Sequence, residues 1–211
     1  MYRFVKRGFD FISASLLFLA ISPLYLILMT LVRVKIGSPI YFKQQRTGLN
    51  GQRFYIKKFR TMTDEKDDSG NYLPDEQRQT KFGNWLRGSS LDELPELLCI
   101  IKGDMSVIGP RPLPPQYDKY YSEYEKNRFR VKGGLVPPEV LYRDLEPSWD
   151  NQLKYEADYA LRCSAALDMR ILIAAMKGVF IRYSSSYGDY IRTSLSEERK
   201  GRIEKIGAAK I

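Results

Sequence analysis

FISASLLFLAISPLYLILMTLV, residues 11–32, is an almost wholly apolar stretch of about the length that crosses a lipid bilayer as an α-helix. Basic residues flank it on both sides, with Arg3, Lys6 and Arg7 before it and Arg33 and Lys35 after it. A cleaved signal peptide has a small-residue cleavage site before a polar region, whereas this stretch leads into further basic residues. We therefore expect a retained membrane anchor.

The flanking charges bear on how the stretch enters the membrane. Basic residues prefer the cytoplasmic side, so the symmetric flanks favour placing both ends of the stretch there. Ser22-Pro23 lies near the middle, where proline removes a backbone donor and the serine hydroxyl can bond a freed carbonyl. Two structures fit these residues: a broken helix that enters and leaves by one leaflet, and a proline-kinked helix that spans the bilayer.

Composition narrows the class of protein. The formal net charge of +9 and the pI near 9.4 favour anionic partners such as phospholipid surfaces, nucleotides or nucleic acids. Histidine is absent, which excludes Ser-His-Asp and Cys-His catalysis and every histidine-containing zinc site. Cys99 and Cys163 lie in apolar helical patterns, so we expect core cysteines in a reducing compartment and no disulfide.

The remaining chain predicts an α+β domain that is mostly helical. Aromatic and branched residues on either side of Gly48 and Asn50-Gly51 predict a small β-hairpin over 40–59. An exposed polar loop is expected over 64–76. Apolar spacing predicts two later helices, over 151–162 and 167–180. We expect two parts, a membrane anchor over 1–36 and a catalytic domain over 37–211.

Two further patterns have the i, i+3, i+4, i+7 spacing of one helix face. The first is Leu94, Leu97, Leu98 and Ile101. The second is Tyr117, Tyr120, Tyr121 and Tyr124. The tyrosine stripe fits an interfacial amphipathic helix at the level of the lipid headgroups, and it equally fits a stripe packed on the core of the domain.

Asp92 and Glu93 are adjacent carboxylates just before the first of these apolar helices. Two neighbouring carboxylates can divide roles, with one attacking a phosphate or binding Mg²⁺ and the other handling protons. At a positive helix end Asp92 would stay ionised, where phosphate anions also bind. Ser90-Leu91-Asp92-Glu93 also matches a capping box, in which Ser90 caps the helix and Glu93 reaches back. This structural role competes with the catalytic one.

Gly109-Pro110-Arg111-Pro112 is the second segment with a chemical signature. The prolines restrict the backbone on both sides of Arg111, so its guanidinium can be held rigidly for phosphate oxygens. An ordinary surface arginine in a turn is the alternative. Lys58, Arg60 and Arg87 are further candidates for contacting a substrate phosphate, and a solvated charge is the alternative for each.

Taken together, these segments resemble the small monotopic phosphoglycosyl transferases, the bacterial sugar transferases that start glycoconjugate assembly on a polyprenyl phosphate carrier. The resemblance covers nearly the whole chain and depends on several segments in the right order. They are the basic start and apolar run with Ser22-Pro23, Lys58-Phe59-Arg60-Thr61-Met62, Arg87 through Ser90-Leu91-Asp92-Glu93-Leu94-Pro95, Lys102-Gly103-Asp104-Met105-Ser106, and Gly109-Pro110-Arg111-Pro112.

The resemblance implies a re-entrant membrane helix broken at Ser22-Pro23 and a ping-pong reaction with Mg²⁺, for which Asp92 is the candidate ligand. Asp92 would attack the sugar-linked phosphate of a UDP-sugar, release UMP and carry the phospho-sugar until polyprenyl (undecaprenyl) phosphate accepts it. Glu93 would be the neighbouring proton handler, and Arg111 would lie beside the phosphate site. The expected location is the cytoplasmic face of the bacterial inner membrane, among membrane lipids.

One segment departs from the family pattern. Where the family usually carries Pro-Gly-Ile-Thr-Gly and then Ala-Gln, this chain has Gly133-Gly134-Leu135-Val136-Pro137-Pro138-Glu139. The two prolines stiffen the loop, and Glu139 places a carboxylate where a neutral amide neighbourhood is expected. The choice of sugar or acceptor is therefore left open.

The sequence thus predicts a transferase that moves a phospho-sugar from a UDP-sugar to polyprenyl phosphate. A UDP-sugar glycosyltransferase or hydrolase is an alternative, and it would release UDP or free sugar phosphate. A noncatalytic membrane scaffold is another, in which Asp92 and Glu93 only cap a helix. Nucleic-acid binding rests on charge alone, and the long apolar start argues against it.

Overall fold

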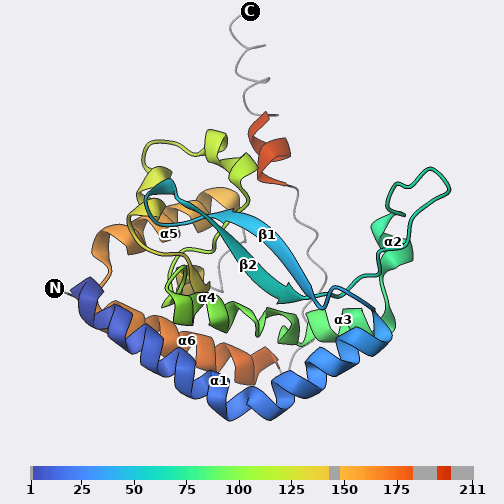
Figure 1. Ribbon diagram of the computed structural model, residues 1–211. Helices are drawn as coiled ribbons and strands as arrows, with labels where there is room; N and C mark the ends of the chain where they lie inside the picture. Colours follow the sequence, from blue (N-terminus) through green and yellow to red (C-terminus); the bar gives the residue numbers. More distant parts are fainter. Residues whose placement is uncertain (1, 143–147, 183–193, 201–211) are drawn as a thin grey trace, which may run out of the picture. The chain divides into compact units, whose positions relative to one another are not determined.

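The computed structural model describes residues 2–142, 148–182 and 194–200 and is mostly helical, with two small two-stranded sheets (Figure 1). The α-helices are α1 (Tyr2–Lys35), α2 (Asp75–Arg78), α3 (Lys81–Gly88), α4 (Glu96–Lys102), α5 (Trp149–Arg162) and α6 (Ala165–Arg182). The strands are β1 (Tyr41–Thr47), β2 (Arg53–Phe59), β3 (Ser106–Ile108) and β4 (Gly134–Val136). The 3₁₀ helices are η1 (Leu49–Gly51), η2 (Leu91–Glu93), η3 (Pro115–Tyr120), η4 (Glu125–Arg130) and η5 (Pro138–Tyr142). These elements confirm the predicted mostly helical class.

The chain forms two compact units. The first unit holds residues 3–45 and 55–105, and the second holds residue 2, residues 46–54 and the described residues from 106 onward. The predicted boundary at residue 36 concerns the membrane rather than packing, and it stays a prediction.

Helix α1 keeps Pro23 inside a single helix of 34 residues, and its ribbon bends midway along its length (Figure 1). Proline has no N–H to donate to the carbonyl four residues earlier, which belongs to Leu19. The Ser22 hydroxyl donates to that carbonyl instead, with Oγ 2.8 Å from the oxygen. The serine therefore satisfies the carbonyl freed by the proline, as the sequence predicts, and the bend costs no unpaired backbone group.

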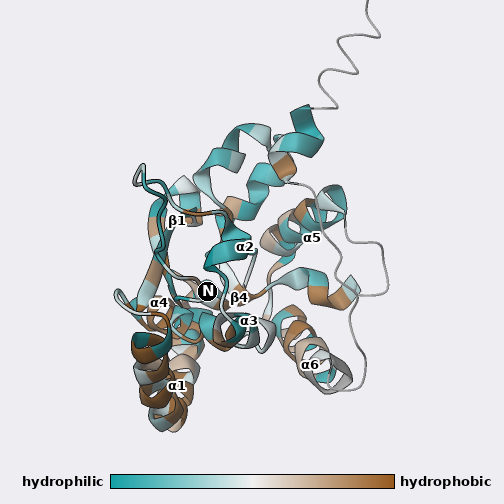
Figure 2. Ribbon diagram, turned by 90° about the vertical axis from the view of Figure 1, so that its right-hand side faces the viewer, coloured by the Kyte–Doolittle hydropathy of each residue, from teal (hydrophilic) through white to brown (hydrophobic). Residues whose placement is uncertain are grey.

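The two halves of α1 differ in what covers them. The C-terminal half packs into the first unit, where Tyr25, Leu28 and Val32 form a core cluster with Phe59 of β2 and Leu86 of α3. The apolar side chains of the other half are largely exposed. Only 17% of the most apolar window of α1 is buried, and its ribbon is predominantly hydrophobic (Figure 2). Among the described residues, α1 is the one helix long and apolar enough to cross a membrane.

Arg7 fastens the N-terminal half of α1 to the end of α4. Its two terminal nitrogens donate to the carbonyls of Ile100 and Ile101, each at 2.7 Å. These carbonyls belong to the last turn of α4, which lacks the regular donors four residues later; that of Ile100 also accepts from the N–H of Gly103. One of the basic residues that flank the apolar stretch is thus a helix cap in the structure.

The predicted hairpin is present as β1 and β2. Its turn contains Asn50 and Gly51, both with positive φ, at 52° and 77°. The Gly48 N–H donates to the carbonyl of Gln52 at 2.9 Å and closes the turn. Asn-Gly is the pair that tolerates this left-handed backbone, which is why it marked the turn in the sequence.

The helix face predicted from the spacing of Leu94, Leu97, Leu98 and Ile101 is only partly correct. Helix α4 begins at Glu96, and it buries Leu97, Cys99 and Ile100. Leu98 and Ile101 are partly exposed, so the predicted stripe does not coincide with the buried face. The physical reason lies upstream, because the chain forms a separate 3₁₀ turn before Pro95 and the α-helix starts only after it.

In the second unit, β3 and β4 pair in parallel, with Ser106 opposite Gly134 and Ile108 opposite Val136. The strands approach so closely at Gly134 that an added Cβ would lie 2.1 Å from the backbone nitrogen of Gly109. Helices α5 and α6 confirm the two later helices that the sequence predicts. Their inner residues Tyr159, Ala160 and Ile171 complete a core with Ile108 and Val131.

The tyrosine stripe is not the face of one helix. Helix η3 ends at Tyr120 and the backbone of Tyr121 is extended, so the predicted helical spacing is interrupted. Tyr121 is buried, and Tyr117 and Tyr120 pack against the same cluster, which contains Trp149. These three residues therefore follow the core alternative. Tyr124 is 47% exposed, and its hydroxyl donates to a carboxylate of α5.

Candidate active site

Asp92 and Glu93 lie in η2, a single 3₁₀ turn between α3 and α4. Ser90 precedes the turn with φ 58° and ψ 15°, in the left-handed region, and its side chain caps nothing. A capping residue needs an extended backbone, so the predicted capping box is wrong. The expectation that Asp92 occupies the first turn of an α-helix is also wrong, because α4 begins four residues later. Capping therefore does not account for the two carboxylates.

The side chain of Asp92 is buried, with the residue 7% exposed. Burial raises the pKa of this carboxyl, and the charge of Glu93 raises it further, while the charges of Lys58 and Arg87 lower it. The two cations therefore favour the ionised form in a place that desolvates it. An ionised carboxylate with few waters to lose and cations nearby is suited to attack an electrophile or to bind a metal ion.

Lys58 joins two carboxylates beside this site. It extends from β2, and its Nζ lies 2.6 Å from Oε1 of Glu93 and 3.4 Å from Oε1 of Glu96. Glu96 is 6% exposed and is a site residue that the sequence motifs do not predict. Its position three residues after Glu93 was the available signal, because residues at that spacing lie on one side of a helical segment.

Arg87 is held in place through Thr61. Its Nη2 donates to the Thr61 hydroxyl, 2.8 Å away, and Thr61 itself is buried. Helix α3 carries Arg87 and approaches Thr61 closely at Gly83, where an added Cβ would lie 1.8 Å from the Thr61 carbonyl oxygen. In the sequence, Thr61 is notable only as part of Lys58-Phe59-Arg60-Thr61-Met62. Its contact with α3 is formed by the tertiary structure.

Arg60 has a different environment from the other cationic candidates. Its buried guanidinium donates to the carbonyls of Met62 and Pro39, at distances of 3.2 to 3.4 Å, and lies 3.0 Å from a carboxylate oxygen of Asp64. These contacts hold the chain after β2. The predicted contact of Arg60 with a substrate phosphate stays untested.

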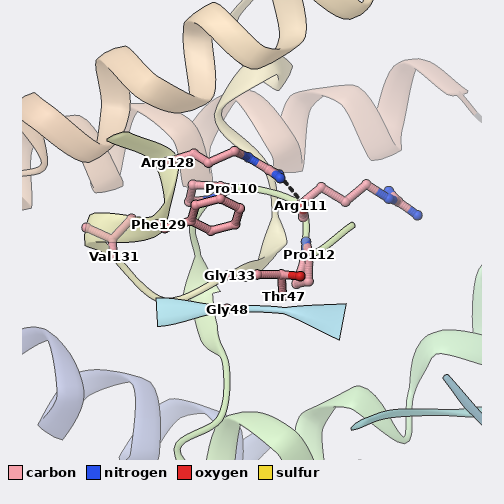
Figure 3. A pocket seen from close by; sticks show the side chains of 9 residues that line it. All are labelled: Thr47, Gly48, Pro110, Arg111, Pro112, Arg128, Phe129, Val131 and Gly133. Carbon is pink, nitrogen blue, oxygen red and sulfur yellow. Dashed lines mark hydrogen bonds between the residues drawn. The ribbon is translucent and has the colours of Figure 1, made fainter. Parts of the chain in front are cut away.

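Arg111 belongs to the second unit. It follows Pro110, and the segment borders a shallow hollow whose empty volume, open solvent included, is about 170 Å³ (Figure 3). The nine residues drawn in Figure 3 line this hollow, and the side chain of Arg111 extends away from Pro110 and Phe129. The backbone of Arg111 is hydrogen-bonded to Arg128 and Glu156.

Glu139, the carboxylate that departs from the family pattern, lies in η5 of the same unit. Its Oε2 is buried and has no hydrogen-bond partner among the described residues. Burial, with a smaller effect of Glu156, raises the pKa of Glu139 to about 8, although the charges of Arg111 and Arg128 lower it. The raised pKa favours the neutral form of the Glu139 carboxyl.

The residues described also bear on a magnesium site. They contain no group of three or more aspartate, glutamate or cysteine side chains arranged to hold a metal ion. Mg²⁺ often uses only one or two carboxylates and takes its other ligands from water and substrate phosphates. The carboxylate of Asp92, with Glu93 next to it, fits that limited role.

Comparison with known proteins places the chain in a family. A family model described as bacterial sugar transferase matches residues 1–182. The chain is 42% identical over 177 residues to "Uncharacterized sugar transferase EpsL" of Bacillus subtilis, a match that covers 84% of this chain and 88% of that protein. It is 32% identical over 197 residues to "Exopolysaccharide production protein ExoY" of Rhizobium meliloti, covering 85% and 87% of the two proteins.

A third relative carries a name that specifies a reaction. It is the "UDP-glucose:undecaprenyl-phosphate glucose-1-phosphate transferase" of Xanthomonas campestris, 34% identical over 176 residues. That match covers 78% of this chain but only 36% of the longer Xanthomonas protein. The matched family covers both units of the fold and both carboxylates of η2, and the chain is therefore a transferase that belongs to the bacterial sugar transferases.

Proposed function

We propose that this protein transfers a phospho-sugar from a UDP-sugar to undecaprenyl phosphate, with Asp92 as the nucleophile. A carboxylate oxygen of Asp92 attacks the sugar-linked phosphorus, the bond to the bridging oxygen of the diphosphate breaks, and UMP leaves. A phosphate oxygen of the lipid then attacks the same phosphorus. This second step forms a lipid diphospho-sugar and returns the Asp92 carboxylate.

The observation that carries the proposal is the buried carboxylate of Asp92 next to the Lys58–Glu93 pair. Lys58 and Arg87 provide positive charge to offset the repulsion between an anionic nucleophile and an anionic diphosphate. The names of the Xanthomonas protein and of an Aeromonas hydrophila relative, "UDP-N-acetylgalactosamine-undecaprenyl-phosphate N-acetylgalactosaminephosphotransferase", supply the donor and acceptor classes. The two names specify different sugars, so the proposal names none.

Glu93 is the proposed proton handler. Its Oε1 lies 2.6 Å from Nζ of Lys58, and this ion pair holds its carboxylate next to Asp92. Arg111 is the proposed contact for a substrate phosphate in the second unit. When bound, Mg²⁺ would be held by Asp92 and by phosphate oxygens, and it would neutralise negative charge on the diphosphate.

The test of the reaction is the identity of the released nucleotide. The protein in a membrane mimetic is given Mg²⁺, undecaprenyl phosphate and, in separate reactions, UDP-glucose, UDP-galactose and their N-acetylated forms. We expect UMP and a lipid diphospho-sugar from one donor. We also expect a donor labelled in its sugar-linked phosphate to leave label on the protein when the lipid is omitted. Release of UDP would support a glycosyltransferase and contradict the proposal.

A pH profile tests the environment of Asp92. The carboxylate must be ionised to attack, so activity is lost as the pH falls through its pKa. Lys58 lowers that pKa, and Lys58→Met is therefore expected to move the acid limb of kcat/KM to higher pH. Lys66→Met, in the exposed loop, removes the same charge and is expected to leave the limb in place. A limb that moves equally in both variants would show only a general charge effect.

We also propose that α1 enters and leaves the membrane by the cytoplasmic leaflet, with the bend at Ser22 and Pro23. The bonded Leu19 carbonyl and the basic residues at both ends support this topology. Cysteines introduced at Arg3 and at Lys35, in a Cys163→Ser background, are expected to resist a membrane-impermeant maleimide in intact spheroplasts. Both should react after lysis, as should Asp68→Cys in the loop. Labelling of one end in intact spheroplasts would establish a spanning helix.

A further inference from the structure

The charged pair Arg128 and Glu156 is buried in the second unit. Arg128 extends from η4 and Glu156 from α5, and their side chains are 1% and 0% exposed. Nε of Arg128 donates to Oε2 of Glu156 at 2.9 Å, and Nη2 lies 2.7 Å from the same oxygen. Such a pair gains little stability over apolar residues of similar volume, because both charges lose their hydration. Its presence therefore calls for a reason other than stability.

The remaining hydrogen-bonding groups of the pair hold one residue, Arg111. Its N–H donates to Oε1 of Glu156 at 3.0 Å, and its carbonyl accepts from Nη2 of Arg128 at 2.5 Å. Figure 3 shows the guanidinium of Arg128 directed at the backbone of Arg111. The N–H of Arg111 is the single backbone donor within Pro110-Arg111-Pro112, since proline has none. Both backbone groups of Arg111 are therefore fixed by one ion pair.

The pair is itself held in orientation. Nη1 of Arg128 donates to the Tyr121 hydroxyl at 2.9 Å, and the guanidinium carbon lies 5.1 Å from the Tyr121 ring centre. The Gln152 amide donates to Oε1 of Glu156 at 3.1 Å. Two neighbours thus restrict the rotamers of the pair, and little freedom remains in the backbone that the pair holds.

A close backbone contact fixes the segment from another side. The Gly134 N–H donates to the carbonyl of Pro110 at 2.9 Å. An added Cβ on Gly133 would lie 2.4 Å from Cγ of Pro112. The direction of the Arg111 side chain is therefore determined by contacts to the backbone on both sides of the segment. The ion pair supplies those made by charged groups.

We propose that Arg128 and Glu156 are positioning residues, which fix the backbone of Arg111 so that its guanidinium meets a substrate phosphate in one orientation. The inference rests on the proposed function, because that function gives Arg111 its phosphate. It adds that the effect of the pair on activity passes through Arg111. The phosphate belongs either to the UDP-sugar or to the lipid, and the KM for each substrate distinguishes the two.

The test is a double-mutant cycle between the pair and Arg111. Arg128→Met with Glu156→Leu removes both charges together, so no buried charge is left without a partner. We expect this variant to fold with a lowered unfolding temperature, because the backbone groups of Arg111 lose their partners, and to lose about 30-fold in kcat/KM, comparable to a misplaced charged hydrogen bond. We expect Arg111→Ala to lose about as much. The variant with all three changes should be no worse than Arg111→Ala alone, because the pair then has no side chain to position.

Two further variants keep the result decisive. Glu156→Gln retains the volume and an acceptor for the Arg111 N–H but removes the charge that pairs with Arg128. It serves in the cycle if the double change does not fold, with a smaller expected loss of kcat/KM. Glu125→Gln with Arg199→Met removes the ion pairs of Arg199 with Glu125 and Asp150, each with N and O 2.7 Å apart, and should leave kcat/KM unchanged. Multiplicative losses in the cycle, or full activity without the buried pair, would overturn the inference.

The outcome separates this inference from the proposed function. If the parent protein releases no UMP from any donor, the proposed function fails. The double-mutant cycle is then measured by equilibrium binding of UDP-sugar and of undecaprenyl phosphate to the same variants, which needs no turnover. If the parent releases UMP and Arg111→Ala is fully active, the role of Arg111 fails. If Arg111→Ala is impaired but the losses multiply, only the positioning role fails.

Discussion

Asp92→Asn is expected to lower phospho-sugar transfer by at least about 10⁴-fold, because an amide cannot act as the nucleophile that forms the covalent intermediate. The change should not disturb the fold. The native environment already disfavours the charged form of this buried carboxyl, so a neutral isostere fits it well. UMP release and label transfer from the donor phosphate to the protein should both be lost, while the thermal unfolding temperature is kept or slightly raised.

The matched control is Asp68→Asn, which makes the same chemical change in the exposed loop. It should retain parental activity, and this would show that loss of one negative charge is not the cause. Glu93→Gln should retain the covalent label while slowing turnover, because the proposed role of Glu93 is proton handling rather than attack. Undiminished UMP release from Asp92→Asn would remove Asp92 from the nucleophile role.

Gly83→Ala is expected to destabilise the protein by about 3 kcal/mol, the upper part of the usual range for overpacking. The new methyl group would start 1.8 Å from the Thr61 carbonyl oxygen, and that atom belongs to the backbone rather than to a flexible side chain. Movement of α3 away from Thr61 would also displace Arg87, whose guanidinium bonds the Thr61 hydroxyl. We therefore expect the unfolding temperature to fall by about 10 °C together with a loss of kcat/KM.

Gly88→Ala is the control within the same helix. An added Cβ there meets nothing within 4 Å, and the residue is exposed at the end of α3. Alanine is the better helix former, so the free energy of unfolding should change little or rise by up to about 1 kcal/mol. Equal destabilisation by both changes would show that the close contact with Thr61 does not set the cost of a methyl group at Gly83.

Local patterns in the sequence predict the parts of the fold that short-range chemistry controls. Asn50-Gly51 marks the hairpin turn because few other pairs accept its positive φ values. The apolar spacing that indicated α5 and α6 reflects faces that pack in the core of the second unit. Ser22 and Pro23 predicted both the bend in α1 and the bond that satisfies the Leu19 carbonyl.

The errors occur where tertiary contacts override such patterns. Ser90 is a residue type that often caps helices, but its backbone is left-handed, and a 3₁₀ turn replaces the predicted helix start. The tyrosines have helical spacing, yet the chain becomes extended at Tyr121 and the side chains join the core around Trp149. Spacing alone cannot report these outcomes, because they depend on contacts with residues distant in the sequence.

By itself, the sequence determined the family of this protein, its apolar N-terminal helix and the two carboxylates proposed for catalysis, because each is contained in a short contiguous segment. Only the tertiary structure decided which cations accompany those carboxylates. It paired Lys58 with Glu93 and Glu96, bonded Arg60 to backbone carbonyls, and buried an ion pair against the backbone of Arg111. The physical reason is that a charge acts through distance and desolvation, and both are set when separate segments pack together.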